Sequence, residues 1–467
     1  MTESGSAQVS GGVYDASRSD GEFRAAFVNG NIPVSVYGLG KMGLPLAAVF
    51  AEVTGNVLGA DIDETVVDAV NDGTCHVKRE PGLAALVDET VSKGALAATT
   101  EPRDAATAGA VHVIIVPTPI TDRNEPDLAI LDAVVEDIGR GLEPGDFVVV
   151  ECTVPPRTTV DRVLPQLEAT SGLSREAFGV AFCPERTSSG RALEDIRGAY
   201  PKVVGGVDDE STRLAAAMYR EINDKGVIPV DDATTAEAVK VFEGVYRDVN
   251  IALANELATF TDDLEIDVRE AIGVANTQPY CDIHDPGPGV GGHCIPFYPY
   301  FLIDPFETDA PLLETARAVN DSMPGYTVEK LRDGLAAEGT PLSEASVLLL
   351  GLTYRPGVEE IRASPSIAIA DRLTAEGASV YGVDPMLDSF DAFDLEPIAL
   401  EEVYEHSFDG VVLVTPHEEF EEIRWEDVNV RDAEDGLCII DGRDTLERPA
   451  LEAGGHRVYT IGGVADV

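Results

Sequence analysis

The sequence predicts an α/β protein in which two Rossmann-like, doubly wound domains are joined by a central domain built on a long helix. Short apolar strands alternate with helical patterns before residue 208 and again after Ala345, which is typical of parallel sheets covered by helices. Between these regions, residues 232–263 form one Ala-rich, helix-compatible run without proline. The 467 residues suffice for two or three domains. We therefore divide the chain into an N-terminal extension (1–30), a first Rossmann domain (31–208), a helical centre (209–335) and a second Rossmann-like domain (336–467).

In the first half of the chain, the predicted elements follow one another in a strand–helix rhythm. Residues 1–30 are rich in Ser, Gly and Asp, and we expect a flexible extension with one short helix near residues 21–27. The predicted helix at 42–54 follows the first strand directly. The predicted strands are residues 34–38, 56–62, 111–116 and 146–151, and residues 181–184 and 202–205 are candidates for the end of this layer.

In the second half, the pattern changes and then returns. The long helix of residues 232–263 continues as helical pattern to about Ala275, and residues 311–339 form another helix. The segment 285–292, DPGPGVGG, holds too much Gly and Pro for either element, so we expect a loop. From Ala345 the predicted order is strand 346–352, helix 366–377, strand 379–384, and then strands near 410–414 and 437–441.

Charge and composition exclude several classes of function. The chain carries 84 acidic residues against 33 cationic ones, seven of them lysine, and its formal net charge is -51. Such a field repels nucleic acids and anionic membranes, and the acids are spread along the chain, as in proteins adapted to molar salt. No apolar run is long enough to span a membrane, and no signal-peptide core is visible. Six sparse cysteines without a CxxC or a zinc spacing favour a reducing compartment without metal, so we expect a cytoplasmic protein.

The strongest motif in the first domain is a glycine-rich turn, Gly38-Leu39-Gly40-Lys41-Met42-Gly43, between a predicted strand and a predicted helix. Glycines at these positions allow a tight turn and let the backbone approach a pyrophosphate at the helix N-terminus. Asp61 ends the next predicted strand, where an acid can bind both ribose hydroxyls and repels a 2′-phosphate. The turn, helix and acid together predict binding of NAD in preference to NADP. The neighbouring acids Asp63 and Glu64 are interpreted as solvated surface residues.

Two further segments follow predicted buried strands. They are residues 116–119, VPTP, and 152–156, CTVPP. The carboxyl ends of strands line the ligand crevice of an open α/β sheet, so both segments are candidates for the site. Proline can also simply terminate a strand, and the spacing alone leaves the two interpretations open.

Cys294 closes the loop GPGVGGHC, whose backbone N–H groups can stabilise a thiolate or a phosphate. The other five cysteines, 75, 152, 183, 281 and 438, fit the alternative of buried structural thiols. Lys240 lies in the long helix between apolar neighbours, in a chain with very few lysines. A lysine in such a place can serve acid/base or oxyanion chemistry, although a helical lysine is more often a surface residue. Glu185 in Cys183-Pro-Glu-Arg could reach the same crevice.

Seven ordered segments, GLGKMG, VPTP, CTVPP, PER, AEAVK, GPGVGGHC and GLTYRPGVEEIRASP, resemble those of the nucleotide-sugar dehydrogenases, the UDP-glucose/UDP-mannuronate dehydrogenase family. The resemblance covers residues 32–465. Four segments, PERTSSGRALED, VYRDVNIALANEL, PGPGVGGHCIP and ARAVNDSMP, look most similar to the UDP-N-acetyl-D-mannosamine dehydrogenase branch, and the charge suggests a halophilic archaeal member. The resemblance implies an NAD-binding domain, a helical dimer-forming centre, a UDP-binding domain and oxidation of a sugar C6 alcohol to a carboxylate with two NAD and no metal.

The resemblance also implies roles for individual residues. Cys294 would be the nucleophile, Lys240 would stabilise or protonate the C6 oxygen, Glu185 would activate water, and Thr153 would sit beside the nicotinamide. The implied NAD-binding residues are Gly38, Gly40, Lys41, Met42, Gly43, Asp61, Pro117, Thr118, Thr153 and Arg362. The implied substrate-binding residues are Glu185, Arg186, Lys240, Gly287, Gly289, Gly291, Gly292, Tyr354 and Arg355, the last standing where the family often has Lys.

The chemistry requires these residue types. A four-electron oxidation must turn the intermediate aldehyde carbon into a hydride donor again. Thiolate addition gives a thiohemiacetal, its oxidation gives a thioester, and water releases the acid. The reaction therefore needs a cysteine, a donor near the oxygen and an acid/base for water.

Three positions depart from the family pattern. Gly244 stands where Asn is usual, four residues after the lysine, and Tyr298 where Asp is usual, four residues after the cysteine. Tyr280 stands where an Arg often reaches the partner subunit's site. Tyrosine can replace a donor but not a carboxylate base at neutral pH. The departures leave the orientation of Lys240 and of the hydrolytic water open.

We therefore predict an NAD-dependent UDP-sugar 6-dehydrogenase that acts on UDP-N-acetyl-D-mannosamine as a homodimer or higher homo-oligomer. UDP-glucose and UDP-N-acetyl-glucosamine are the alternative substrates. A β-hydroxyacid dehydrogenase shares the GLGxMG opening, but it needs neither the GGHC loop nor a second α/β domain. A nucleotide-sugar-binding protein without catalysis is the third alternative, and only Gly244 and Tyr298 favour it. The number of NADH formed per substrate, two, one or none, separates the three.

Overall fold

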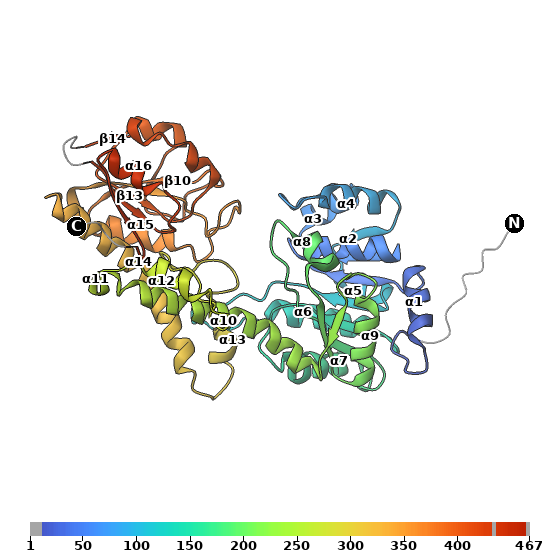
Figure 1. Cartoon of the computed structure of the whole chain (residues 1–467). Coiled ribbons are helices and arrows are strands. Elements are labelled where there is room, and N and C mark those ends of the chain that lie inside the picture. The colour runs from blue at the N-terminus through green and yellow to red at the C-terminus, as the bar shows by residue number, and fades with distance from the viewer. Residues whose placement is uncertain (1–11, 432–435, 464–467) are drawn as a thin grey trace. The chain divides into compact units, whose positions relative to one another are not determined.

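A computed structural model describes residues 12–431 and 436–463 and shows two compact units (Figure 1). Unit 1 comprises Met1–Phe242 and Tyr300–Phe306, and unit 2 comprises Glu243–Pro299 and Glu307–Val467. The chain therefore passes between the units more than once. The two Rossmann-like sheets and the long central helix confirm the predicted fold class. The predicted boundaries at 208 and 335 remain predictions.

Unit 1 is built on an eight-stranded sheet with the order β3-β2-β1-β4-β5-β6-β7-β8. The strands from β3 to β6 are parallel, whereas β7 runs antiparallel to β6. Val34 of β1 pairs with Val57 of β2 and with Val111 of β4, which sets the register at the centre. The strands are β1 Val34–Tyr37, β2 Val57–Ala60, β3 Leu96–Thr99, β4 Val111–Ile114, β5 Phe147–Val150, β6 Gly179–Phe182, β7 Lys202–Gly206 and β8 Val227–Pro229.

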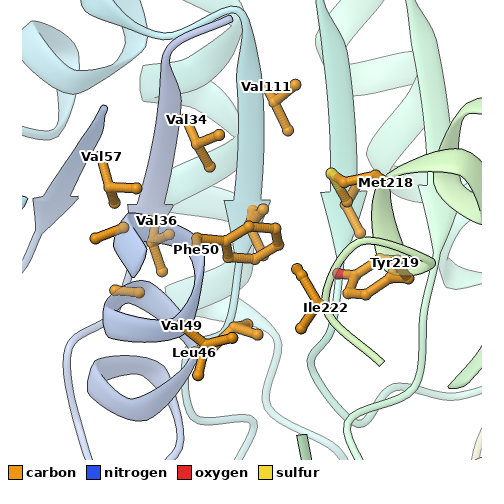
Figure 2. Close-up of a cluster of buried hydrophobic side chains, with 14 of the residues drawn as sticks. Val34, Val36, Leu46, Val49, Phe50, Val57, Val111, Met218, Tyr219 and Ile222 are labelled. Carbon is orange, nitrogen blue, oxygen red and sulfur yellow. The ribbon is translucent and has the colours of Figure 1, made fainter. Parts of the chain in front are cut away.

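Several helices of unit 1 bury an apolar face against its sheet. Figure 2 shows Phe50 of the first crossover helix between Val36 and the side chains of Met218 and Tyr219. The fully apolar face of this helix explains why it was predictable from sequence. The helices are α2 Gly43–Thr54, α3 Glu64–Asn71, α4 Leu83–Ser92, α5 Pro102–Ala108, α6 Ala129–Gly141, α7 Leu164–Ser171, α8 Ala192–Glu194, α9 Asp209–Tyr219 and α13 Tyr300–Ile303.

The predicted N-terminal extension is not loose where the structure describes it. Helix α1 (Asp20–Val28) begins with a capping box between Ser19 and Glu22. Its two phenylalanines, Phe23 and Phe27, are fully buried and stack with ring centroids 5.5 Å apart. Val13 is buried as well. The compositional interpretation of residues 1–30 as flexible is therefore wrong for residues 12–30, because these apolar side chains complete the core of unit 1.

The helical centre contains α10 (Ala233–Ala258), the long helix predicted over residues 232–263. Its end is earlier than predicted, and α11 (Thr261–Leu264) and α12 (Val268–Ala275) follow. In unit 2, α10 packs on α14 (Pro311–Ala337) through a buried polar cluster. Asp248 of α10 pairs with Arg317 and accepts a hydrogen bond from the Asn320 amide at 2.9 Å. The cluster gives one oxygen of this buried carboxylate two partners and fixes the register of the two helices.

Unit 2 also holds a six-stranded parallel sheet with the order β11-β10-β9-β13-β15-β16. Its strands are β9 Ser346–Leu350, β10 Ser379–Val383, β11 Glu396–Pro397, β13 Gly410–Leu413, β15 Cys438–Asp441 and β16 Arg457–Thr460. The remaining elements are α15 Pro365–Ala375, α16 Arg448–Ala453 and the pair β12 Ser407–Phe408 and β14 Asn429–Val430. Counted within each sheet, the second order reads 3-2-1-4-5-6 and the first begins in the same way before β7 and β8, so the connections reverse direction between β1 and β4, and between β9 and β13. Ligands bind at such switch points, outside the carboxyl ends of the strands.

Candidate active site

The glycine-rich turn lies at the carboxyl end of β1, at the switch point of unit 1. Gly38 has φ +94°, and a Cβ there would lie 2.6 Å from the carbonyl oxygen of Ile115. A Cβ on Gly43 would lie 1.9 Å from the carbonyl oxygen of Gly38, so the helix start packs tightly on the turn. Gly40 is exposed, and a Cβ there would meet no other atom within 4 Å. The turn is thus closed on its sheet side and open on its outer side, as a pyrophosphate cradle requires.

Asp61 follows β2 and fixes this turn. One carboxylate oxygen accepts a hydrogen bond from the Leu39 N–H at 2.8 Å, and the other accepts one from the Asp63 N–H at 3.0 Å. Asp61 is half-buried, so the acid lies beside the turn with part of its surface open. Lys41 and Met42 complete the turn, the lysine exposed and the methionine half-buried. The residues present therefore fit a dinucleotide whose ribose diol binds Asp61.

The segments after β4 and β5 lie side by side. The Thr118 hydroxyl donates a hydrogen bond to the Thr153 carbonyl at 2.6 Å, and the Val116 N–H donates one to the Cys152 sulfur at 3.3 Å. Thr153 is half-buried and Pro117 is exposed. Both proline-containing segments therefore lie side by side at the carboxyl ends of neighbouring strands, where ligands bind in an open α/β sheet, and this favours the site interpretation over simple strand termination.

Lys240 of α10 meets Glu185, which follows β6. The ammonium donates a hydrogen bond to the Glu185 carbonyl and lies 3.8 Å from a carboxylate oxygen of the same residue. Only 10% of the Lys240 side chain and 17% of that of Glu185 are exposed. The second oxygen of Glu185 accepts hydrogen bonds from the backbone and hydroxyl of Thr187. Since the Thr187 hydroxyl also contacts the sulfur of Met42 at 2.9 Å, the pair lies next to the glycine turn.

A small pocket joins Met42 and Glu185 to a buried ion pair that the sequence analysis missed. Lys202 of β7 lies 2.5 Å from a carboxylate oxygen of Glu151, whose other oxygen accepts a hydrogen bond from the Tyr219 hydroxyl. Burial raises the pKa of Glu151, and the lysine opposes this effect. The scarcity of lysine could have pointed to Lys202, because two of the seven lysines, Lys202 and Lys240, lie near Glu151 and Glu185.

Arg186 and Tyr200 close the same pocket. The Arg186 guanidinium lies 4.8 Å from the centre of the Tyr200 ring, and the Tyr200 hydroxyl donates a hydrogen bond to the Arg186 carbonyl. The guanidinium also donates to the carbonyl of Pro201. Arg186, predicted to bind substrate, is therefore held beside Glu185 by an aromatic face.

Glu237 connects the helix of Lys240 to the segment of Thr153. It lies three residues before Lys240 on α10 and is fully buried. Its carboxylate accepts hydrogen bonds from the Arg157 N–H at 2.6 Å and from the N–H and hydroxyl of Thr159 at 2.7 and 2.6 Å. Burial nevertheless raises the pKa of Glu237 to about 7. The sequence analysis did not single out this residue, although Glu237 and Lys240 share a helix face.

Cys294 belongs to unit 2 and is the exposed cysteine of the six. Burial raises the pKa of Cys152 and of Cys438 to about 12, and that of Cys183 well above its usual value. These thiols are therefore inert at neutral pH, as predicted for structural cysteines. Cys294 remains the candidate nucleophile.

The glycine loop before Cys294 packs closely on the segment 354–365 of the same unit. A Cβ on Gly291 would lie 2.7 Å from Cβ of Tyr354, and one on Gly292, whose φ is +103°, would lie 3.0 Å from the Tyr354 ring. The Gly292 N–H donates to the Arg362 carbonyl at 2.8 Å. Gly289 likewise faces Pro365. Only glycine permits this approach, which explains the composition of the loop.

Arg362 and Arg355 both lie in this segment, half-buried. The Arg362 guanidinium lies 4.8 Å from the centre of the Phe297 ring, three residues after Cys294. Arg362 is therefore attached to the cysteine turn in unit 2, and its predicted contact with NAD remains a prediction. Tyr280, which replaces an expected arginine, is 92% exposed.

Arg443 is a candidate residue that the sequence analysis missed. Its side chain is half-buried, and among the described residues it forms no ion pair with a carboxylate. It donates only long hydrogen bonds, 3.3 Å to the Val414 carbonyl and 3.4 Å to the Gly289 carbonyl. Burial, with Arg269 nearby, lowers the pKa of Arg443 to about 10. Its place two residues after β15, in a DGR segment at the sheet's carboxyl edge, was a usable signal.

A half-buried guanidinium that forms no ion pair is suited to an anionic ligand. It faces Gly287, whose Cβ would lie 2.5 Å from the guanidinium nitrogen, so the loop and Arg443 form one surface. The predicted site residues thus fall into two groups, one in each unit. The group in unit 1 comprises the glycine turn, Asp61, Pro117, Thr118, Thr153, Glu185, Arg186 and Lys240, and the group in unit 2 comprises the glycine loop, Cys294, Tyr354, Arg355 and Arg362.

Two searches of the described residues bear on other kinds of site. No cluster of three or more His, Cys, Asp or Glu side chains in residues 12–431 and 436–463 has the arrangement of a metal site. Over the same residues, no helix is both long and apolar enough to cross a membrane.

Comparison with protein families finds three consecutive matches. Residues 32–223 match the NAD binding domain of the UDP-glucose/GDP-mannose dehydrogenase family, residues 234–322 its central domain, and residues 348–448 its UDP binding domain. The glycine turn, α10 and the cysteine-loop partner segment thus fall in three different family domains.

Individual relatives agree over nearly the whole chain. The UDP-N-acetyl-D-mannosamine dehydrogenase of Pyrococcus horikoshii is 36% identical over 90% of this chain and 97% of its own. A solved structure of the enzyme of that name from the same organism superposes with a TM-score of 0.83 over 92% of this chain and 99% of its own, at 34% identity. The NDP-N-acetyl-D-galactosaminuronic acid dehydrogenase of Ralstonia nicotianae is 36% identical over 84% of this chain and 92% of its own.

Proposed function

Because the chain belongs to the UDP-glucose/GDP-mannose dehydrogenase family, as an NAD-dependent enzyme, we propose that it oxidises the C6 alcohol of UDP-N-acetyl-D-mannosamine to the carboxylate. The observation that carries the proposal is Cys294, the exposed cysteine, at the end of a glycine loop that packs on the nucleotide domain. Several similar relatives bear the name of this activity. UDP-glucose and UDP-N-acetyl-glucosamine are the alternative substrates, and the uronate product would serve polysaccharide biosynthesis.

The cofactor site fits NAD. Gly38, Gly40 and Gly43 with the N-terminus of α2 would hold the pyrophosphate, and Asp61 would hold the ribose diol. Thr118 and Thr153, joined by their hydrogen bond, would flank the nicotinamide end. NAD, when bound there, accepts the hydride in each of the two oxidation steps.

Residues of both groups would carry out the remaining chemical steps. Lys240 would stabilise the C6 oxygen or protonate it, because its ammonium is a donor held in a nearly buried position, and the proton of the alcohol would leave to water. The Cys294 thiolate would add to the aldehyde carbon, so that C6 becomes tetrahedral and can lose a second hydride. Glu185 would take a proton from the water that cleaves the resulting thioester, which releases the carboxylate and restores the thiolate.

The nucleotide would bind in unit 2. We assign the uridine diphosphate to the surface formed by Arg443 and the loop residues Gly287 and Gly289, because this guanidinium is half-buried beside the loop and forms no ion pair among the described residues. Tyr354 and Arg355, which adjoin the same loop in the GLTYRP segment, would complete the contacts.

We further propose a homodimer in a salt-rich cytoplasm. Apolar side chains are exposed along α10 and α12, among them Tyr246 at 51%, Leu253 at 48% and Val274 at 65%. Tyr246 and Leu253 are seven residues apart and therefore share a helix face. The net charge of -51 favours a cytoplasm of high ionic strength, and no nucleic acid or membrane partner is expected.

The test is the stoichiometry of NADH formation. In high salt, the enzyme should form two NADH per UDP-N-acetyl-D-mannosamine, and a panel with UDP-glucose and UDP-N-acetyl-glucosamine ranks the sugars. Cys294→Ala should still bind UDP by calorimetry, while acid formation falls about a thousandfold or more. Cys281→Ala is the matched control, since this thiol lies outside the glycine loop. One NADH per substrate, or a Cys294→Ala variant with wild-type turnover, would contradict the proposal.

A further inference from the structure

The ring of Tyr298 packs against the backbone of Gly244, where there is no side chain. Tyr298 lies four residues after Cys294 and is 7% exposed. A Cβ on Gly244 would lie 2.0 Å from Cδ2, 2.7 Å from Cγ and 2.9 Å from Cβ of Tyr298. Any side chain at position 244 would therefore occupy the space of the ring. Glycine is a weak helix former, so its presence inside the 26-residue helix α10 needs a local reason, and the ring supplies it.

The same tyrosine belongs to the turn that carries the thiol. The Tyr298 N–H donates to the Cys294 carbonyl at 2.9 Å, and the Phe297 N–H donates to it at 3.1 Å. Phe297 in turn contacts the guanidinium of Arg362. The turn 294–298 is thus attached on one side to the segment of Arg362 and on the other, through the Tyr298 ring, to α10. Gly244 lies one helical turn after Lys240 on that helix.

We propose that Tyr298 is a positioning residue for Cys294, and that the two unusual residues Gly244 and Tyr298 form one coupled pair. The inference rests on the proposed role of Cys294 as nucleophile. Removal of the ring, or insertion of a methyl group beneath it, displaces the turn from α10 and moves the thiol from its reactive position. Misplacement of a nucleophile by about 1 Å lowers the rate by roughly a hundredfold, whereas binding of a nucleotide held by other residues changes little.

The experiment is a double-mutant cycle with Gly244→Ala, Tyr298→Ala and the double variant. Each single variant should lower kcat for UDP-N-acetyl-D-mannosamine by tenfold to about a hundredfold, while KM stays within about threefold. The double variant should be no slower than Tyr298→Ala alone, because the methyl group then enters empty space. Tyr298→Phe keeps the ring and should restore kcat to within about threefold of the wild type.

The matched control is Gly273→Ala in α12, where a Cβ would meet no other atom within 4 Å, and it should leave kcat unchanged. Additive losses in the double variant would overturn the proposal. A Tyr298→Phe variant as slow as Tyr298→Ala would also overturn it, since the hydroxyl and not the ring would then matter. If Tyr298→Ala does not fold, Tyr298→Leu tests the same loss of the ring.

A second measurement separates this inference from the proposed activity. Hydrogen exchange at the amides of Phe297 and Tyr298 reports the turn directly and needs no substrate. Exchange should become at least about tenfold faster in Tyr298→Ala and Gly244→Ala, and should stay slow in Tyr298→Phe and Gly273→Ala. Unchanged exchange in both alanine variants would overturn the positioning role even if the enzyme oxidises the UDP-sugar. The expected exchange pattern without any UDP-sugar oxidation would instead contradict the proposed function alone.

Discussion

Glu237 shows how one buried carboxyl group can connect two parts of a cofactor crevice. It accepts three hydrogen bonds from the segment after β5 and lies on the helix that carries Lys240. Burial dominates over these donors and raises the pKa of Glu237 to about 7. The folded state therefore favours the neutral carboxyl, and the group contributes stability that is present below about pH 4.5 and is lost as the pH rises through about 7.

We expect this contribution to be visible as a pH-dependent difference between the wild type and Glu237→Gln. The shift from 4.5 to about 7 corresponds to on the order of 3 kcal/mol of unfolding free energy between the neutral and the charged form. The free energy of unfolding of the wild type relative to the variant should fall between pH 5 and pH 8, as measured in urea at constant salt. Glu243→Gln on the same helix is the control. A difference that stays constant with pH would show that Glu237 titrates normally.

Asp61 should determine the choice of cofactor. Asp61→Ala should raise KM for NAD about tenfold or more and narrow the preference over NADP, because the ribose diol loses its acceptor and the repulsion of a 2′-phosphate disappears. Asp63→Ala is the matched control, because Asp63 caps α3 through the Thr65 N–H and lies on the same surface. A wild type that prefers NADP, or equal effects of both substitutions, would contradict the role of Asp61.

At the residue scale, site residues could be predicted from the sequence where their role depends on residues close to them along the chain. The glycine turn, Asp61 and the cysteine loop are readable because each needs a particular residue at a fixed spacing from a strand or helix. The position of Arg443 after β15 was a usable signal, but its contact with Gly287 was not readable from the sequence. The contact of Tyr298 with Gly244 was not readable either, because each contact joins residues 54 or more positions apart along the chain. The sequence showed that Gly244 and Tyr298 depart from the family pattern, but it did not show that the two residues contact each other.

At the scale of elements, the burial of α1 is the clearest difference from the prediction. A short helix near residues 21–27 was expected and is present, but the polar composition of residues 1–30 concealed two phenylalanines four residues apart, which share one helix face and enter the core. Phe23→Ala should lower the free energy of unfolding by about 3–5 kcal/mol, because it removes a fully buried ring from the core of unit 1. Arg24→Ala, whose side chain is exposed and pairs with Glu221, is the control and should change stability by less than about 1 kcal/mol.

A small effect of Phe23→Ala in chemical denaturation would mean that α1 contributes little to the fold.

The central strands of both sheets were predicted within a few residues, because they are short, continuous apolar runs between turn residues. The strands β3, β11 and β16, towards the edges of the sheets, were not predicted. The direction of β7 was not predictable, since an apolar run reads the same in both directions. Strand β8 is also hard to recognise, because it has only three residues and ends in a proline.

At the scale of the whole molecule, the net charge sets the conditions under which the fold is stable. The Debye length shrinks from about 10 Å to about 3 Å between 0.1 M and 1 M salt, so repulsion among the surface acids weakens strongly. We expect the thermal midpoint and activity to rise together as potassium chloride is added over this range. Sucrose is the control, because it stabilises by exclusion but does not screen charge. An unchanged midpoint with full activity in dilute buffer would contradict adaptation to salt.

The repeated passage of the chain between the two units limits how the enzyme can be dissected. Unit 1 requires residues 300–306, which follow 57 residues of unit 2 and include Phe301, a side chain only 2% exposed. A gene fragment that stops at Phe242 would therefore lack residues 300–306 of unit 1. The apolar surface that these residues cover would be exposed to solvent. An isolated cofactor domain would have to be a rearranged polypeptide, with residues 300–306 grafted onto its end by a designed linker.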